Sequence, residues 1–297
     1  MKTVWPVMIT PFHADKSVDY QGLEAVVEWY ISKGVDGLFA VCQSSEMFHL
    51  TLEERVKIAS LVVKVTNGRV PVVASGHISD TVPMQLEELK AIHNTGVNAV
   101  VLVTNRLAKQ EEDDSISKAN LETVFNAIPD CIFGLYECPY PYKRLISNDL
   151  LKFCADSGRV AFFKDTCCDI EMLKERIAIT NASGLKLYNA NTATLLESLR
   201  LGCDGFSGIM ANFHPELYIW LTRNFESNKA DFIQHFATMA GNVYCRAYPN
   251  NAKYYMQLTG VPIEHYSREN KDELFTPLIM DETEQFYKLW NELNILG

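Results

Sequence analysis

The stretch Val160-Ala161-Phe162-Phe163-Lys164 places four apolar residues directly before a lysine. A short apolar run without polar alternation is typical of a parallel β-strand that is buried on both faces. Similar runs recur on either side of it. The sequence therefore predicts eight strands, at residues 4–9, 37–41, 70–74, 99–103, 132–136, 160–164, 185–189 and 205–207.

Helix signals separate these runs. Asp19 can cap a helix that Gly34 ends, and Thr51 with Glu54 forms a capping-box pattern. Further helices are expected at residues 81–94, 117–127, 150–155, 171–180, 194–200 and 214–224. A strand followed by a helix eight times favours an α/β fold of the closed (β/α)8 type, a TIM barrel. The alternation alone also fits a doubly wound sheet.

The remaining 70 or so residues differ in pattern from the repeats. They contain Pro249, Pro262 and Pro277 and indicate two or three further helices. We expect residues 1–228 to form the barrel and residues 229–297 to form a C-terminal helical extension of the same domain.

Composition excludes several functional classes. The net charge of −10 does not suit a nucleic-acid partner. The eight cysteines show no Cys-x-x-Cys spacing and the seven histidines are dispersed, so we expect reduced thiols and no metal site. The first residues lack a signal-peptide pattern, and no apolar stretch approaches a membrane span, so we expect a cytoplasmic protein without a membrane partner.

In a TIM barrel, chemistry takes place where the strands end. Lys164 ends one apolar run, and burial there would lower its pKa and leave a neutral amine able to attack a carbonyl carbon. The alternative is a lysine whose ammonium group reaches solvent. Tyr136 ends another run and could pass protons, or it could be an aromatic residue of the rim.

Four further strand ends carry candidate substrate-binding residues. Hydroxyl and backbone N–H groups in the Gln43-Ser44-Ser45-Glu46 turn could hold a carboxylate, although an ordinary turn has the same composition. Ser207, His77 and Arg106 also follow strands and could contact substrate. For His77 and Arg106 the alternative is a loop residue without a special role.

Several short motifs, which follow one another in a fixed order along residues 4–225, add to these observations. They are Val7-Met8-Ile9-Thr10-Pro11-Phe12, Glu46 with Leu50-Thr51 and Glu54-Arg55, Tyr136-x-x-Pro139, Lys164-Asp165-Thr166-Cys167-Cys168-Asp169, Gly202-Cys203-Asp204-Gly205 and Ala211-Asn212. Together they resemble the family of dihydrodipicolinate synthase and N-acetylneuraminate lyase, which are pyruvate-dependent class I aldolases. The resemblance implies that Lys164 forms a Schiff base and that Tyr136 relays protons.

The chain departs from the family pattern at two relay positions. Gln43 replaces the first threonine of a Gly-Thr-Thr-Gly-Glu motif, and Leu107 falls where the family lends a tyrosine to a neighbouring subunit. The synthases have an arginine shortly after the tyrosine that Tyr136 matches. This chain has no arginine at that position, and Arg144 is nearby but out of register with the motif. These changes argue against dihydrodipicolinate synthase itself and indicate a divergent member.

The resemblance implies a lyase that acts on pyruvate or a longer 2-oxo acid, such as a 2-keto-3-deoxy sugar acid, and possibly on an aldehyde as second substrate. No cofactor beyond the covalent imine on Lys164 is expected. The alternatives are a 2-keto-3-deoxy sugar acid dehydratase and a non-catalytic oxo-acid-binding protein. The resemblance also implies a homotetramer or homodimer.

Overall fold

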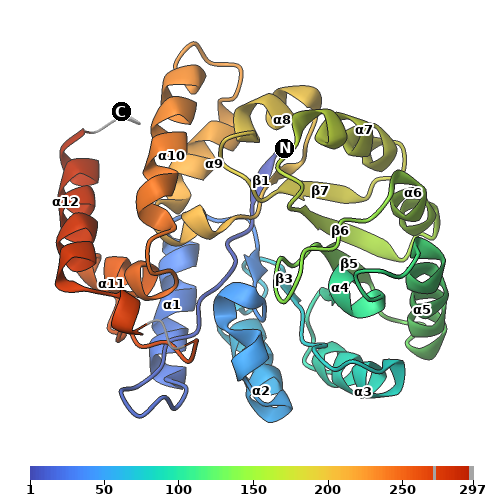
Figure 1. The fold of residues 1–297 in the computed structure, drawn as a ribbon. Helices are drawn as coiled ribbons and strands as arrows, with labels where there is room; N and C mark the ends of the chain where they lie inside the picture. Colours follow the sequence, from blue (N-terminus) through green and yellow to red (C-terminus); the bar gives the residue numbers. More distant parts are fainter. Residues whose placement is uncertain (270–271, 294–297) are drawn as a thin grey trace.

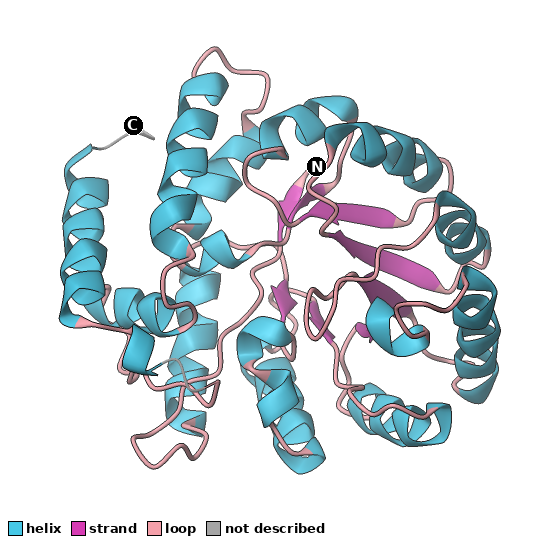
Figure 2. Ribbon diagram, viewed as in Figure 1, coloured by secondary structure: helices cyan, strands magenta, loops and turns pink. Residues whose placement is uncertain are grey.

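The computed structural model describes residues 1–269 and 272–293. Its described strands form one parallel sheet at the centre of the molecule, ringed by helices (Figures 1 and 2). The spatial order of the strands is β1-β8-β7-β6-β5-β4-β3-β2. Their bounds are Thr3–Val4 (β1), Leu38–Phe39 (β2), Val72–Ala74 (β3), Ala99–Val103 (β4), Phe133–Tyr136 (β5), Val160–Asp165 (β6), Lys186–Asn189 (β7) and Gly205–Phe206 (β8).

The sheet closes on itself through the chain that follows β1. Val7 forms a parallel bridge to Phe39 of β2, and the N–H of Met8 donates to the carbonyl oxygen of Phe39 at 2.9 Å. On the other side, β1 pairs with β8, where a Cβ at Gly205 would overlap the carbonyl of Thr3. The predicted TIM barrel is confirmed, and the doubly wound alternative is wrong.

The predicted strand at residues 4–9 is regular only as far as Val4. Pro6 has no N–H to donate, so the ladder is interrupted there and only its carbonyl pairs, with the N–H of Phe39 at 3.0 Å. All eight predicted strands are otherwise present, several of them one or two residues shorter than expected.

The helices lie where the capping signals place them. Asp19 accepts from the N–H of Gly22, and Thr51 and Glu54 form the predicted capping box. The helices are Tyr20–Ser32 (α1), Leu52–Thr66 (α2), Val82–His93 (α3), Thr104–Leu107 (α4), Asp114–Ala127 (α5), Asn148–Asp156 (α6), Ile170–Asn181 (α7), Leu195–Leu201 (α8), Pro215–Arg223 (α9), Ala230–Tyr244 (α10), Asn250–Leu258 (α11) and Pro277–Leu293 (α12).

Two helix predictions need correction. The helix expected from residue 117 begins at Asp114, because the carboxylate of Asp113 accepts from the N–H of Ser115 and caps it earlier. The single turn of α4 was not expected, since residues 104–107 carry no capping pattern. None of the helices in the described part of the chain combines the length and apolarity needed to span a bilayer.

The C-terminal extension forms α10, α11 and α12, which stand beside α1 on one side of the barrel (Figure 1). A small apolar cluster that includes Phe213, Tyr244 and Phe286 joins these helices to the barrel. Tyr248 and Pro249, between α10 and α11, line the cavity described next together with residues at the ends of β5 and β6.

Candidate active site

Lys164 lies on β6 and Tyr136 on the neighbouring strand β5. The two residues are direct partners in the parallel register, so both side chains project from the same face of the sheet. The Nζ atom of Lys164 lies 4.3 Å from the centroid of the Tyr136 ring and 5.8 Å from that of Phe39. The amine is therefore held between two aromatic rings at the end of the strands.

The surroundings of Lys164 favour a neutral amine. Its side chain is 3% exposed, and among the described residues Nζ has no hydrogen-bond or carboxylate partner. Burial lowers the pKa of Lys164 to about 8, and only the nearby thiols of Cys42 and Cys138 act in the opposite direction. At pH 7 roughly a tenth of such a lysine carries a free lone pair, against fewer than about one in a thousand for a solvated lysine.

The predicted turn after β2 forms the 3₁₀ turn Gln43–Ser45. The amide oxygen of Gln43 accepts from the hydroxyl of Tyr136 at 3.4 Å and from the thiol of Cys138 at 3.3 Å. Ser44 is buried beside the same space. The turn thus brings Gln43 and Ser44 to Tyr136 and Lys164.

These four residues surround a cavity of about 330 Å³ at the carboxyl end of the barrel. Its wall combines two strand-end residues with the turn after β2 and with parts of the extension. The lining residues are Gln43, Ser44, Tyr136, Pro139, Lys143, Lys164, Thr166, Cys168, Ala190, Asn191, Gly208, Ile209, Met210, Tyr248, Pro249 and Glu269.

Two predicted serines lie outside this lining because the backbone holds their hydroxyls. Ser45 donates to the carbonyl of Met8 at 2.7 Å, and its N–H donates to Cys42 within the turn. Ser207 donates to the carbonyl of Trp5 at 2.9 Å. Both hydroxyls are bound to the chain that follows β1, and neither residue lines the cavity.

His77 and Arg106 also lie elsewhere. His77 is fully buried, contacts the amide oxygen of Gln85 and accepts from the N–H of Val103, and burial lowers its pKa to about 4. Arg106 forms an ion pair with Asp80 at 2.8 Å and lines a separate cavity. Their strand-end positions are as predicted, but the side chains turn toward α3 and the outer surface.

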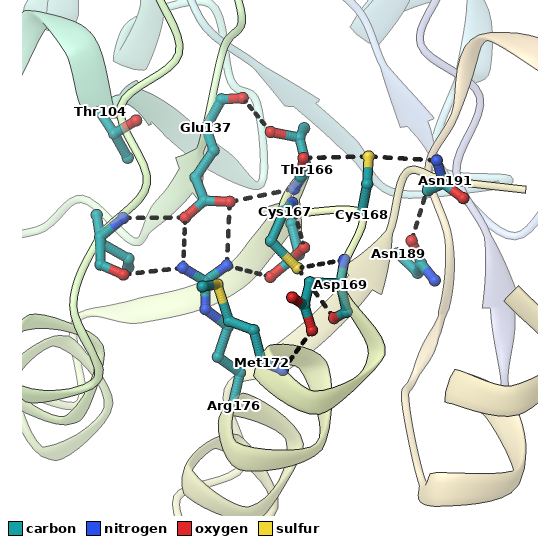
Figure 3. A network of polar contacts seen from close by, with 12 residues as sticks. Thr104, Glu137, Thr166, Cys167, Cys168, Asp169, Met172, Arg176, Asn189 and Asn191 are labelled. Carbon is teal, nitrogen blue, oxygen red and sulfur yellow. Dashed lines mark hydrogen bonds and ion pairs between the residues drawn. The ribbon is translucent and has the colours of Figure 1, made fainter. Parts of the chain in front are cut away.

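Other lining residues were not singled out from the sequence. Thr166 and Cys168 follow Lys164 by two and four residues, a spacing that could have indicated them. Cys168 has a left-handed backbone (φ 61°), and its sulfur accepts from the amide of Asn191 at 3.2 Å (Figure 3). Tyr248 comes from the extension, where the sequence holds no signal that it reaches the barrel.

Behind the cavity, one buried arginine joins the residues that follow Tyr136 and Lys164. The guanidinium of Arg176, on α7, binds Glu137 at 2.9 Å and also Asp165 (Figure 3). It further donates to the carbonyl of Ile146 at 2.8 Å. This network fixes the ends of β5 and β6 relative to each other and so fixes the two candidate catalytic side chains.

Within residues 1–269 and 272–293, no group of three or more His, Cys, Asp or Glu side chains is placed to hold a metal ion. The described cysteines are free thiols, and Cys168 and Cys245 are the exposed ones among them.

A family model described as the dihydrodipicolinate synthetase family matches residues 1–289. The 4-hydroxy-tetrahydrodipicolinate synthase of Methanococcus vannielii is 27% identical, with 100% of this chain and 99% of that protein covered. That of Oceanobacillus iheyensis is 25% identical, with 88% of each covered.

Solved structures show the same fold. The prophage protein YagE of Escherichia coli K12, in complex with pyruvate, superposes with a TM-score of 0.87 at 21% identity and covers 98% of this chain and 99% of its own. The N-acetylneuraminate lyase of Fusobacterium nucleatum, complexed with pyruvate, gives a TM-score of 0.84 at 19% identity over 97% and 96% of the two chains.

Proposed function

This chain belongs to the dihydrodipicolinate synthetase family of lyases and synthases, and on that premise we propose that it is a Schiff-base-forming lyase acting on pyruvate or a longer 2-oxo acid. Lys164 is the nucleophile of the proposed reaction. The observation that carries the proposal is its buried amine, which has no acidic partner among the described residues and borders a cavity beside a phenol.

The proposed chemistry needs no group beyond the protein and the substrate. The lone pair of Lys164 Nζ attacks C2 of the oxo acid, the C=O π pair moves to oxygen, and a proton passes from nitrogen to that oxygen. Protonation of the hydroxyl expels water and leaves an iminium. The iminium accepts the electron pair released when the neighbouring carbon loses a proton or when its bond to an aldehyde fragment breaks.

Tyr136 is the group proposed to move protons during these steps. Its hydroxyl lies in the cavity beside Lys164, and burial raises its pKa well above the usual value, so it stays protonated and can donate. At rest it donates to the amide oxygen of Gln43, which can accept that hydrogen bond but cannot pass a proton on.

Ser44 is proposed to hold the substrate carboxylate. Its hydroxyl lines the cavity, and the N–H groups of Gln43 and Ser44 open the 3₁₀ turn without a partner inside it. Ser45, predicted for the same role, has both its hydroxyl and its N–H occupied.

The test is to incubate the protein with pyruvate, reduce with borohydride and map the mass gain to a peptide. We expect an adduct on Lys164 that is absent from Lys164→Ala. Lys186→Ala is the control, because Lys186 lies at the opposite end of β7 and pairs with Asp204. Trapping that survives in Lys164→Ala would overturn the proposed mechanism.

A second candidate is dehydration of a 2-keto-3-deoxy sugar acid through the same imine. The cavity of about 330 Å³ extends past Lys164 to polar groups of Thr166 and Asn191, which suit a longer hydroxylated chain than pyruvate. A product assay separates the two: an aldolase releases pyruvate, while a dehydratase keeps the whole carbon chain.

Two further alternatives have distinct outcomes. Dihydrodipicolinate synthesis is disfavoured because Leu107 is a buried hydrocarbon and Gln43 lacks a hydroxyl. A binding protein without turnover would bind a 2-oxo acid and form no product over long incubation.

The assembly as a homotetramer or homodimer stays a prediction, and size exclusion followed by light scattering tests it.

A further inference from the structure

The side-chain amide of Asn212 has a defined orientation. Asn212 ends the 3₁₀ turn after β8 and is fully buried. Its Nδ2 atom lies 2.9 Å from the carbonyl oxygen of Val7, which only accepts hydrogen bonds. The hydroxyl of Tyr30, on α1, donates to Oδ1 at the other end of the amide at 2.7 Å. The amide nitrogen therefore faces Val7, and it also lies 2.6 Å from the hydroxyl oxygen of Tyr248.

This orientation determines how the hydroxyl of Tyr248 is used. An amide N–H only donates, so the Tyr248 oxygen accepts the hydrogen bond from Asn212. The phenolic hydrogen is consequently directed at a partner other than Asn212. Because Tyr248 lines the same cavity as Lys164, a substrate in that cavity can be this partner. Burial raises the pKa of Tyr248, so the phenol keeps its proton until a substrate takes it.

Tyr136 and Tyr248 are attached to opposite sides of the barrel. Tyr136 belongs to β5, whereas the hydroxyl of Tyr248 is bound to Asn212, which follows β8 and contacts Val7 after β1. The strand order runs β1-β8-β7-β6-β5, and the bridge from Val7 to β2 closes the ring, so β1 lies opposite β5. The Tyr136 ring lies 4.3 Å from Nζ of Lys164. Tyr136 is therefore placed for the atoms next to that nitrogen, and Tyr248 for atoms farther across the cavity.

An aldol condensation on a lysine transfers protons to two different oxygens. The oxygen on C2 of the oxo acid leaves as water, and the oxygen of the aldehyde becomes a hydroxyl. At rest Tyr136 donates to the amide oxygen of Gln43 at 3.4 Å, and an amide does not resupply a proton. Tyr248 offers a second O–H group for the second oxygen.

We propose that Tyr248 is a second catalytic residue, which protonates the aldehyde oxygen when the carbon–carbon bond forms and removes that proton when the bond breaks. The inference rests on the proposed function in its aldolase form. When the bond forms, the enamine electron pair of C3 attacks the aldehyde carbon, the C=O π pair moves to oxygen, and that oxygen takes the hydrogen of Tyr248. The N–H of Asn212 stabilises the phenolate, which then recovers a proton from water.

The test compares wild type with Tyr248→Phe, which removes the hydroxyl and keeps the ring, in three measurements with pyruvate. Borohydride trapping reports the imine, and exchange of the C3 hydrogens in deuterium oxide, followed by NMR, reports the enamine. We expect both to stay within about twofold of wild type, because neither involves an aldehyde. Condensation with glycolaldehyde or glyceraldehyde should fall about 10²-fold or more at saturation, with little change in the half-saturating aldehyde concentration.

Two further variants complete the comparison. Tyr254→Phe is the matched control, because its hydroxyl belongs to the extension and donates to Glu284 at 2.6 Å, and all three measurements should match wild type. Tyr248→Met also lacks the hydroxyl and should reproduce the pattern of Tyr248→Phe, so a folding defect in one variant does not decide the test.

The inference and the proposed function fail in different ways. Absence of both the adduct and the exchange in wild type would show that the lysine mechanism is wrong, and the inference would fall with it. If both are present, the inference alone is overturned when wild type condenses pyruvate with neither aldehyde, or when loss of the Tyr248 hydroxyl lowers condensation less than about fivefold. Trapping and exchange that fall together with condensation would place Tyr248 in imine formation and overturn the division between the two phenols.

Discussion

Lys253 of the extension and Glu46, which directly follows the Gln43–Ser45 turn, form an ion pair with both side chains fully buried. Nζ and Oε1 are 2.7 Å apart, and Nζ also donates to the carbonyl of Tyr266. The other carboxylate oxygen accepts from Ser267 and from the N–H of Arg268. The turn that supplies Ser44 to the cavity is thus attached to α11 and to the chain beyond it.

Removing one partner of this pair should lower the free energy of unfolding strongly. Lys253→Met leaves the Glu46 carboxylate buried without its cation, and we expect a loss of about 3–5 kcal/mol in urea unfolding. The exposed pair between Arg200 and Asp231 is the comparison, and Arg200→Ala should cost less than about 1 kcal/mol. Equal losses in the two variants would show that the buried pair has no special role.

Imine formation should depend on pH through Lys164. Burial lowers its pKa to about 8, so the attacking form is the minor one below that pH. We expect the initial rate of adduct formation to rise about tenfold per pH unit up to about 8 and to level off above it. The initial rate is measured by rapid quenching into borohydride at a series of pH values between about 6 and 10. A rate profile with its midpoint near pH 10 would indicate a solvated amine.

Tyr136→Phe should slow the formation of the adduct and leave pyruvate binding nearly unchanged. Loss of a positioned proton donor typically costs about 10²- to 10⁴-fold in rate. Tyr142→Phe is the matched control, because its hydroxyl donates to the carbonyl of Asn105, away from the cavity. A wild-type rate in Tyr136→Phe would assign the proton transfer to another group.

Arg176→Met should destabilise the barrel, since it leaves Glu137 and Asp165 buried without their cation. We expect a loss of about 3–5 kcal/mol in unfolding free energy. Adding Glu137→Gln and Asp165→Asn removes the unpaired charges and should recover part of that loss. If the triple variant is no more stable than Arg176→Met, the cost comes from packing and not from charge.

Alkylation of Cys168 should block the cavity. Its exposed thiol borders the space, whereas the exposed thiol of Cys245 does not. Iodoacetamide should therefore reduce adduct formation in wild type and in Cys245→Ala, but not in Cys168→Ala. Inhibition that persists in Cys168→Ala would point to a different thiol.

The sequence was sufficient to predict the barrel because buried parallel strands leave continuous apolar runs, and Lys164 and Tyr136 stand out at the ends of two of them. It could not separate Ser44 from Ser45, because the geometry of one 3₁₀ turn decides which hydroxyl meets the backbone and which meets the cavity. His77 follows a strand as a substrate-binding residue would, yet its imidazole is enclosed between Gln85 and Val103.

The sequence could not show that Tyr248 lines the cavity, and the reason is different. The position of Tyr248 depends on how α10 and α11 pack against the end of the barrel, where the Tyr248 hydroxyl meets the amide of Asn212, and no local pattern encodes that contact. Ala247, immediately before it, has a left-handed backbone (φ 51°), which turns the chain between the two helices.

Tyr248, Pro249 and Glu269 form a wall of the pocket that comes from the chain beyond β8 and α9, whereas Lys164 and Tyr136 come from the strands. A chimaera that joined residues 1–228 of this protein to the tail of a relative would keep Lys164 and Tyr136 and would exchange that wall. Recombination at such a boundary could therefore give a new choice of substrate while preserving the inherited chemistry.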